Sequence, residues 1–154
     1  MPDSERQRTY DAEARAFAGT LVEAPLTFAE VLELTQAVTA TPWWQRHGGA
    51  VTVVRGQGTS IHSHYRPQTG HIVLSEAQQN PLTLAHELAH AASDDSHGPR
   101  FRAAMCALVH GMCGPGPAGT LRSEFQFGRL TVAAVDLDGL PSPPLLTRHP
   151  RFGT

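Results

Sequence analysis

The stretch LTLAHELAHAASDDSHGPRF, residues 82–101, brings three histidines and a glutamate close together in the sequence. His86 and His90 bracket Glu87 in a His-Glu-x-x-His pattern, and His97 follows after a short polar run. Apolar residues flank the pattern at helical spacing, which predicts that it lies on a helix. Asn80 or Thr83 can cap that helix, with Pro81 in its first turn.

The helical spacing predicts a metal site. Residues four apart project from the same helix face, so His86 and His90 can present two imidazoles to one ion. Neutral imidazoles are zinc ligands, and a bound Zn²⁺ acidifies a water molecule towards neutral pH. Glu87, one position further round, can accept the proton and pass it to the leaving group. The pattern therefore predicts a zinc hydrolase with Glu87 as general base, and the alternative is a histidine pair that binds no metal.

A catalytic zinc ion needs a third protein ligand and one open position. Asp94, Asp95 and His97 are the candidates. Along a straight helix Asp94 would lie ~12 Å from His86, beyond a shared ion. His97 follows Ser-Asp-Asp-Ser, which is suited to end the helix and fold the chain back. We expect His97 to be the third ligand, and Asp94 or Asp95 to support the ligands or to lie where the chain leaves the helix.

The two elements HELAH (residues 86–90) and HGPRFRAAM (residues 97–105) resemble the zinc metalloprotease core of SprT-like proteins, the group that includes Spartan. They are also similar to a small family of uncharacterised bacterial proteins taken to be metallohydrolases. The resemblance implies a zincin-like fold, a peptide or protein substrate and zinc bound by His86, His90 and His97. It also implies packing roles for Phe101 and Met105.

The resemblance is specific over residues 71–105, loose over the preceding sheet and absent elsewhere. The stretch between His90 and His97 is shorter than SprT-like proteins usually have, and no cysteine zinc ribbon follows. Those features relate to DNA contact in the family. We therefore carry over the zinc site and the peptidase chemistry, but not the DNA dependence.

The rest of the chain predicts an α+β fold. Apolar periodicity favours helices over residues 5–18, 27–40 and 99–110, the last closed by Gly111. Short β-branched or alternating runs predict strands over 50–56, 60–66 and 71–75. Turns between them indicate a small, mostly antiparallel sheet against the motif helix, with two or three further helices around it. We further expect 71–75 to be an edge strand that binds an extended peptide.

Two later segments have weaker patterns. Residues 114–119, Gly-Pro-Gly-Pro-Ala-Gly, predict a loop, and residues 124–137 predict a strand or a packed extension. We expect residues 1–140 to form a single domain, followed by a proline-rich tail, 141–154, without clear structure.

The composition excludes several classes of function. Among 154 residues all twelve basic side chains are arginine, so Schiff-base and P-loop lysine chemistry are absent. A formal charge of −2 gives no bulk attraction to nucleic acid. No apolar run is long enough to cross a membrane, and the charged N-terminus does not resemble a signal peptide. We therefore expect a cytoplasmic protein; its oligomeric state is left open.

The remaining polar candidates have ordinary interpretations. Cys106 and Cys113 lie seven apart on an expected helix, ~10 Å between Cα atoms, so they predict reduced thiols. We expect Trp43 and Trp44 to pack in the protein core. We expect the histidines outside the motif to lie at the surface or at helix caps. These are His47, His62, His64, His71, His110 and His149.

Peptide hydrolysis also needs a donor for the developing oxyanion, and Tyr65, His64 and Arg66 are open choices. Two other functional classes remain. One is a zinc hydrolase that cleaves a non-peptide bond, and the other is a non-enzymatic binding module with a closed four-ligand zinc site.

Overall fold

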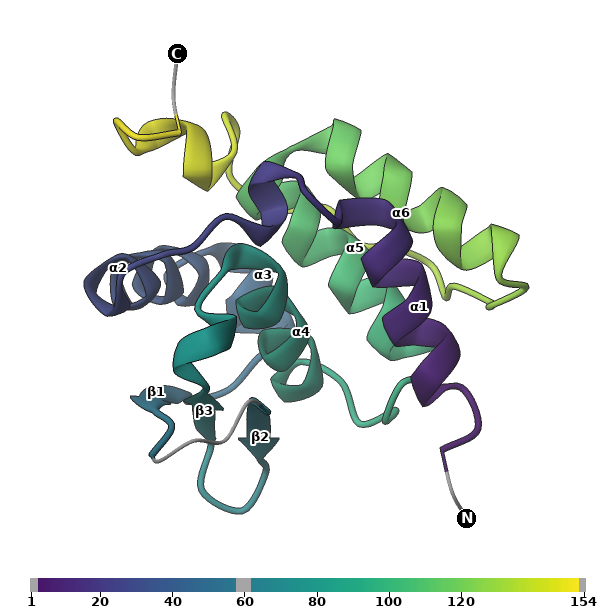
Figure 1. Ribbon diagram of the computed structural model, residues 1–154, viewed down its shortest axis with the longest axis horizontal. Helices are drawn as coiled ribbons and strands as arrows, with labels where there is room; N and C mark the ends of the chain where they lie inside the picture. Colours follow the sequence, from purple (N-terminus) through teal and green to yellow (C-terminus); the bar gives the residue numbers. More distant parts are fainter. Residues whose placement is uncertain (1–2, 58–61, 153–154) are drawn as a thin grey trace.

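The computed structural model describes residues 3–57 and 62–152, and this part of the chain forms an α+β fold (Figure 1). The described residues contain six α-helices and a three-stranded sheet, and the sheet lies at one side of the helices, in contact with α2 and α4 (Figure 1). The helices are α1 (Arg6–Phe17), α2 (Phe28–Thr39), α3 (Pro42–His47), α4 (Pro81–Ala91), α5 (Pro99–Cys113) and α6 (Pro115–Phe127). The strands are β1 (Thr52–Arg55), β2 (His64–Arg66) and β3 (His71–Leu74), and the short 3₁₀ turns are η1 (Leu21–Glu23), η2 (Glu76–Gln78) and η3 (Leu145–Arg148).

The sheet is mixed, with β3 in the centre. β2 and β3 form an antiparallel hairpin in which Tyr65 lies opposite Ile72, whereas β1 pairs in parallel with the other side of β3. The hairpin turn needs Gly70, because its φ is +72° and a Cβ there would lie 2.5 Å from the Ala50 carbonyl oxygen. The prediction of a mostly antiparallel sheet was therefore wrong for one of the two strand pairs.

The prediction that residues 71–75 form an edge strand was also wrong. The strand order is β1-β3-β2, so both sides of β3 are already hydrogen-bonded. Burial explains the central position, since Ile72 and Leu74 are fully buried against the helices. The sheet edges are β1 and β2. Residues 60 and 61 of the expected second strand lie outside the described residues.

The motif helix α4 is the centre of the fold. Asn80 Oδ1 accepts a hydrogen bond from the Thr83 backbone N at 2.8 Å, which makes Asn80 the cap. Leu84 and Leu88 are fully buried, and the helix lies between the sheet and α5 (Figure 1). The prediction of a helix here is confirmed, and its burial gives the motif side chains a rigid support.

The last two helices differ from expectation. Helix α5 continues past Gly111 to Cys113, and the expected loop at 114–119 contains the first turn of α6. Gly114, at φ +105°, reverses the chain, and Pro115 suits the first helical turn. After α6 the chain continues without helix or strand, with Leu130 buried and the backbone N of Ala133 donating to the Pro99 carbonyl oxygen at 3.1 Å. Two alternatives were expected for residues 124–137, a strand or a packed extension. The part of this range that follows α6 is a packed extension.

The proline-rich tail is not without structure. Residues Leu145–Arg148 form η3, whose Leu145 and Leu146 are buried in the core. The short helix α3 was not expected either; Trp43 and Trp44 on it are buried, which confirms their packing role. Both cysteines are free thiols, as predicted.

No helix among the described residues is long and apolar enough to cross a membrane.

Candidate metal centre

Three histidine side chains converge at the C-terminal half of α4. One possible ligand atom each from His86, His90 and His97 lies within 4.8 Å of the other two, and the Nε2 atoms of His86 and His97 are 3.2 Å apart. Around a tetrahedral zinc ion with Zn–N bonds of about 2.0–2.1 Å, neighbouring nitrogens are separated by about 3.3 Å. The separation of His86 and His97 matches this value and the group could hold a metal ion, and among residues 3–57 and 62–152 neither Asp94 nor Asp95 belongs to it.

The loop after α4 carries His97 back to the helix. Ser96 has a left-handed backbone, φ +48°, which reverses the chain direction one residue before His97. Asp95 stabilises the reversal: its carbonyl oxygen accepts from Gly98 N, and its Oδ2 accepts from Arg100 N, both at 2.7 Å. Asp95 thus supports the loop and the first turn of α5 instead of binding the ion.

A buried arginine fixes the backbone of His97, the third candidate ligand. The Arg102 side chain is fully buried, and its guanidinium donates hydrogen bonds to the carbonyl oxygens of His97 and Thr131. It also forms an ion pair with Glu5 at 3.4 Å. The sequence analysis did not identify Arg102, although an arginine on the otherwise apolar face of a helix is a signal for such a role.

Phe101 forms the inner wall of the site. Its ring is fully buried, and its centroid lies 4.9, 4.5 and 5.0 Å from the ring centroids of His86, His90 and His97. It therefore restricts the orientation of all three imidazoles, in the packing position that the resemblance implied.

Helix α1 and the segment just before it supply carboxylates to two of the three histidines. His86 Nδ1 donates to Glu13 Oε2 at 2.8 Å, and both side chains are 5% exposed. His97 Nδ1 donates to Asp3 Oδ2 at 2.6 Å. Because a carboxylate only accepts, each Nδ1 carries the hydrogen and each Nε2 keeps a free lone pair for a metal ion.

The electrostatic environment differs among the three histidines: burial lowers the pKa values of His90 and His97, whereas that of His86 is raised. Burial lowers the pKa of His90 to about 3, reinforced by the charges of His86 and His97, so His90 is neutral and able to bind a metal. Burial would also lower the pKa of His86, but the Glu13 carboxylate outweighs it and raises that pKa. Glu13 therefore stabilises positive charge beside His86, whether a proton or a metal ion carries it.

Glu87 is a buried carboxylate without a complete set of partners. It is 4% exposed, and no protein group in the described part of the chain hydrogen-bonds its Oε2. Burial raises its pKa to about 7. A carboxyl group that titrates near neutral pH can both accept and return a proton, which suits a general base.

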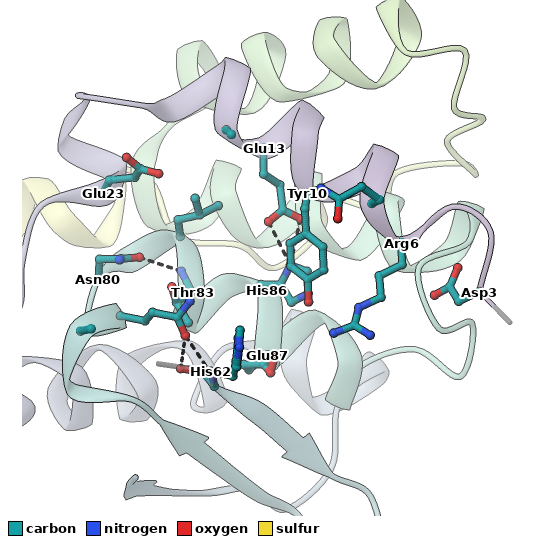
Figure 2. Close-up of a pocket in the computed structure, with 16 residues that line it drawn as sticks. Asp3, Arg6, Tyr10, Glu13, Glu23, His62, Asn80, Thr83, His86 and Glu87 are labelled. Carbon is teal, nitrogen blue, oxygen red and sulfur yellow. Dashed lines mark hydrogen bonds and ion pairs between the residues drawn. The ribbon is translucent and has the colours of Figure 1, made fainter. Parts of the chain in front are cut away.

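Two cavities meet at Glu87. One, of about 860 Å³, extends along α1 towards Glu23 and the start of α4 (Figure 2). The other, of about 600 Å³, extends along β2 towards Asp94 and His97. Both are lined by Asp3, Arg6, Tyr10, Ser63 and Glu87. The candidate metal centre is therefore open on two sides, with space for a chain that passes Glu87.

The expected oxyanion donors are only partly placed at the site. His64 and Tyr65 line the second cavity, whereas Arg66 lines neither cavity and donates from Nε to His64 Nε2 at 3.1 Å. Two other histidines contact carboxylates away from the centre: His47, the last residue of α3, lies 2.6 Å from Asp136 Oδ2, and His149 lies 3.0 Å from Glu30 Oε2.

None of the residues that α1 contributes to the centre was predicted from the sequence. Glu13 lies on the buried face of α1 together with Ala12, Ala16 and Phe17, so an acidic residue on an apolar stripe was the available signal. No comparable signal marked Asp3 or Tyr10. No protein-family model, curated protein or solved structure matches this chain, so residues and geometry alone describe the centre.

Proposed function

We propose that the protein is a zinc-dependent hydrolase that cleaves peptide bonds. One arrangement carries the proposal: three imidazoles close enough to share one metal ion, beside a buried carboxylate with an unsatisfied oxygen. The similarity of residues 71–105 to SprT-like proteins adds the peptidase chemistry as an expectation.

His86, His90 and His97 would hold the zinc ion through three ring nitrogens, leaving one position for substrate or water. A zinc ion there would act as a Lewis acid and make water a nucleophile at neutral pH. Glu87 accepts the proton of the attacking water as the water oxygen bonds to the scissile carbonyl carbon. It then delivers that proton to the amine nitrogen as the C–N bond breaks.

The surroundings of Glu87 favour a peptide over a small molecule. A cavity extends from the centre in each direction, so residues on both sides of a scissile bond have space. The second cavity borders β2, an edge strand whose outer side pairs with no other described strand. An extended peptide can add to such an edge through backbone hydrogen bonds. We therefore assign to β2 the role first expected of 71–75.

Metal analysis with a digestion assay tests the proposal. We expect the purified protein to bind one zinc ion and to cleave casein or members of a quenched peptide library. Glu87→Gln should keep the zinc ion and lose turnover, because the amide cannot accept the proton. His97→Ala should lose both. A Glu87→Gln protein as active as the wild type would contradict the mechanism.

The same experiment separates the two alternatives. Ester and amide small molecules, assayed beside casein, would reveal a hydrolase of non-peptide bonds. A closed binding site is less well supported, because only three ligands come together in the described residues. Cobalt substitution would show a site without exchangeable water if that alternative held.

We retain cytoplasmic localisation as part of the proposal, and assays with and without single-stranded DNA test whether nucleic acid stimulates the reaction.

A further inference from the structure

Cleavage of a peptide requires a hydrogen-bond donor near the carbonyl oxygen, and α1 places one opposite Glu87. Figure 2 shows the Tyr10 hydroxyl and the Arg6 guanidinium pointing from α1 towards the same part of the cavity as Glu87. All three residues line both cavities, so they face the point where a substrate chain would cross the centre. Neither Tyr10 nor Arg6 was among the donors that the sequence suggested.

The aromatic ring of Tyr10 is held against the candidate ligands. It stacks on the His86 ring with centroids 5.0 Å apart and an angle of 11° between planes. It also lies 5.4 Å from the His97 ring at 52°. These two contacts fix the direction in which the hydroxyl projects, although Tyr10 is 37% exposed and reachable by substrate.

We propose that the Tyr10 hydroxyl donates a hydrogen bond to the carbonyl oxygen of the scissile peptide bond as that carbon becomes tetrahedral. This inference rests on the proposed function. The donor and the general base then come from different helices, Tyr10 from α1 and Glu87 from α4, on opposite sides of the substrate chain.

The chemistry of the residues supports this role. Burial raises the pKa of the Tyr10 phenol above its ordinary value near 10, so the hydroxyl keeps its proton at neutral pH and is a donor there. A donor aimed at the position of the developing negative charge stabilises the transition state more than the bound substrate. The hydrogen stays on the Tyr10 oxygen throughout, and the proton taken from water reaches the leaving amine through Glu87, so the reaction balances without a further reactant.

Arg6 is a positioning residue for Tyr10. Its guanidinium carbon lies 5.7 Å from the centre of the Tyr10 ring, within the range of a cation–π contact. A positive charge here also increases the hydrogen-bond acidity of the hydroxyl. Arg6 therefore affects the carbonyl oxygen of the substrate only indirectly, through the Tyr10 hydroxyl.

The first test is the kinetics of Tyr10→Phe, which keeps the ring on His86 and removes only the hydroxyl. We expect kcat to fall by about 10²–10³-fold, the usual cost of one oxyanion donor, with KM and bound zinc unchanged. Tyr10→Ala removes the ring as well and should additionally weaken zinc binding. A Tyr10→Phe protein with wild-type kcat would overturn the role of Tyr10.

Arg6 needs a matched control on the same helix. Arg6→Gln should lower kcat without changing KM, and Arg6→Lys should restore part of it, since only the charge is needed. Arg8→Gln is the control, because Arg8 points to the other side of α1 and donates to the carbonyl oxygens of Gly128 and Arg129. Equal losses in Arg6→Gln and Arg8→Gln would mean a structural effect and would overturn the positioning role.

A binding measurement gives a readout that does not depend on turnover. In the cobalt-substituted protein, inorganic phosphate serves as a tetrahedral anion, and the visible spectrum reports its binding. We expect Tyr10→Phe to weaken phosphate binding about tenfold, the equivalent of one hydrogen bond of roughly 1.4 kcal/mol, with unchanged cobalt affinity. Unchanged phosphate affinity, or a wild type that binds none, would overturn the oxyanion site.

The outcomes distinguish the two proposals. Glu87-dependent hydrolysis in the wild type, together with a fully active Tyr10→Phe, removes the role of Tyr10 and leaves the proposed function intact. Hydrolysis that is absent from the wild type, or unaffected by Glu87→Gln, overturns the proposed function and the role of Tyr10 with it.

Discussion

Helices α4 and α1 both contribute to the candidate centre, but only the sequence of α4 contains a recognisable metal-binding motif. Helix α4 carries the histidines and Glu87 in a compact motif, and its apolar residues are buried on nearly every side. Helix α1 has one buried stripe and an otherwise exposed, charged surface. Yet Glu13 and Asp3, 73 and 94 residues away in sequence, orient two of the three imidazoles.

The difference separates two tasks of a metal centre. Ligands have to be near one another on a rigid element, which local spacing on a single helix and its following loop achieves. Their orientation depends on the outer carboxylates, which can come from any element that packs beside them. In Figure 1 the start of α1 lies beside the loop between α4 and α5, which makes this contribution possible. The comparison predicts larger effects in α4 and graded effects in α1.

The largest effect is expected from a ligand on α4. His90→Ala should lose the metal ion under conditions where the wild type retains it, because the two remaining imidazoles, of His86 and His97, would bind zinc weakly. Metal content after dialysis, measured by atomic emission, checks this. His149→Ala is the control, since His149 pairs with Glu30 away from the centre. Full metal content in His90→Ala would show that the ion binds elsewhere.

The next effect concerns the stability of the two helices. Leu88 is fully buried in α4, so Leu88→Ala should lower the free energy of unfolding by about 2–5 kcal/mol. Gln7→Ala on the exposed face of α1 should change it by about 0.5 kcal/mol or less. Urea denaturation followed by circular dichroism measures both. Similar losses in the two variants would contradict the picture of α4 as the rigid support.

Substitution of Glu13 sharpens the comparison, because it tests the contribution of α1 without replacing a candidate ligand. Glu13→Gln should weaken zinc binding about 10–100-fold, since the amide no longer stabilises positive charge on His86. Asp3→Asn should have a smaller effect, because the Asp3 side chain is 26% exposed and that of Glu13 only 5%. Competition with a chromophoric chelator gives both affinities. Asp11→Asn, on the exposed side of α1, should equal the wild type.

The smallest effect is expected from a carboxylate–histidine pair outside the centre. Hydrogen bonds from Arg46 and His47 hold the pKa of Asp136 well below its ordinary value of 3.8. These contacts therefore stabilise the fold at neutral pH, and the contribution diminishes as the pH falls below about 5, because Asp136 of the unfolded chain takes up a proton before that of the folded protein. Asp136→Asn should flatten the fall of the melting temperature between about pH 5 and 3 without changing zinc affinity. An unchanged pH profile would mean that the ion pair contributes nothing measurable.

Several elements could be predicted because their signals are local. The helix expected over 27–40 forms as α2, which begins with a capping box of Thr27 and Glu30, and Asn80, one of the two expected caps, caps α4. The convergence of His97 with His86 and His90 was also predictable, because only a few residues of loop separate the ligands. The errors lie where the outcome depends on distant partners. Gly-Pro-Gly-Pro at 114–117 favours a loop locally, but burial of Leu121 and Phe125 stabilises a helix.

The sequence by itself determined the motif helix, the reversal that brings His97 back, and the chemical character of the three ligands with Glu87. Only the tertiary structure decided the central position of β3, the exposed edge at β2 and the packing of α1 over the centre. Side chains within one helix and the next loop are held by covalent geometry and short-range hydrogen bonds. Strand pairing and helix packing depend instead on burial shared between segments far apart in the chain, so no local pattern of residues records them.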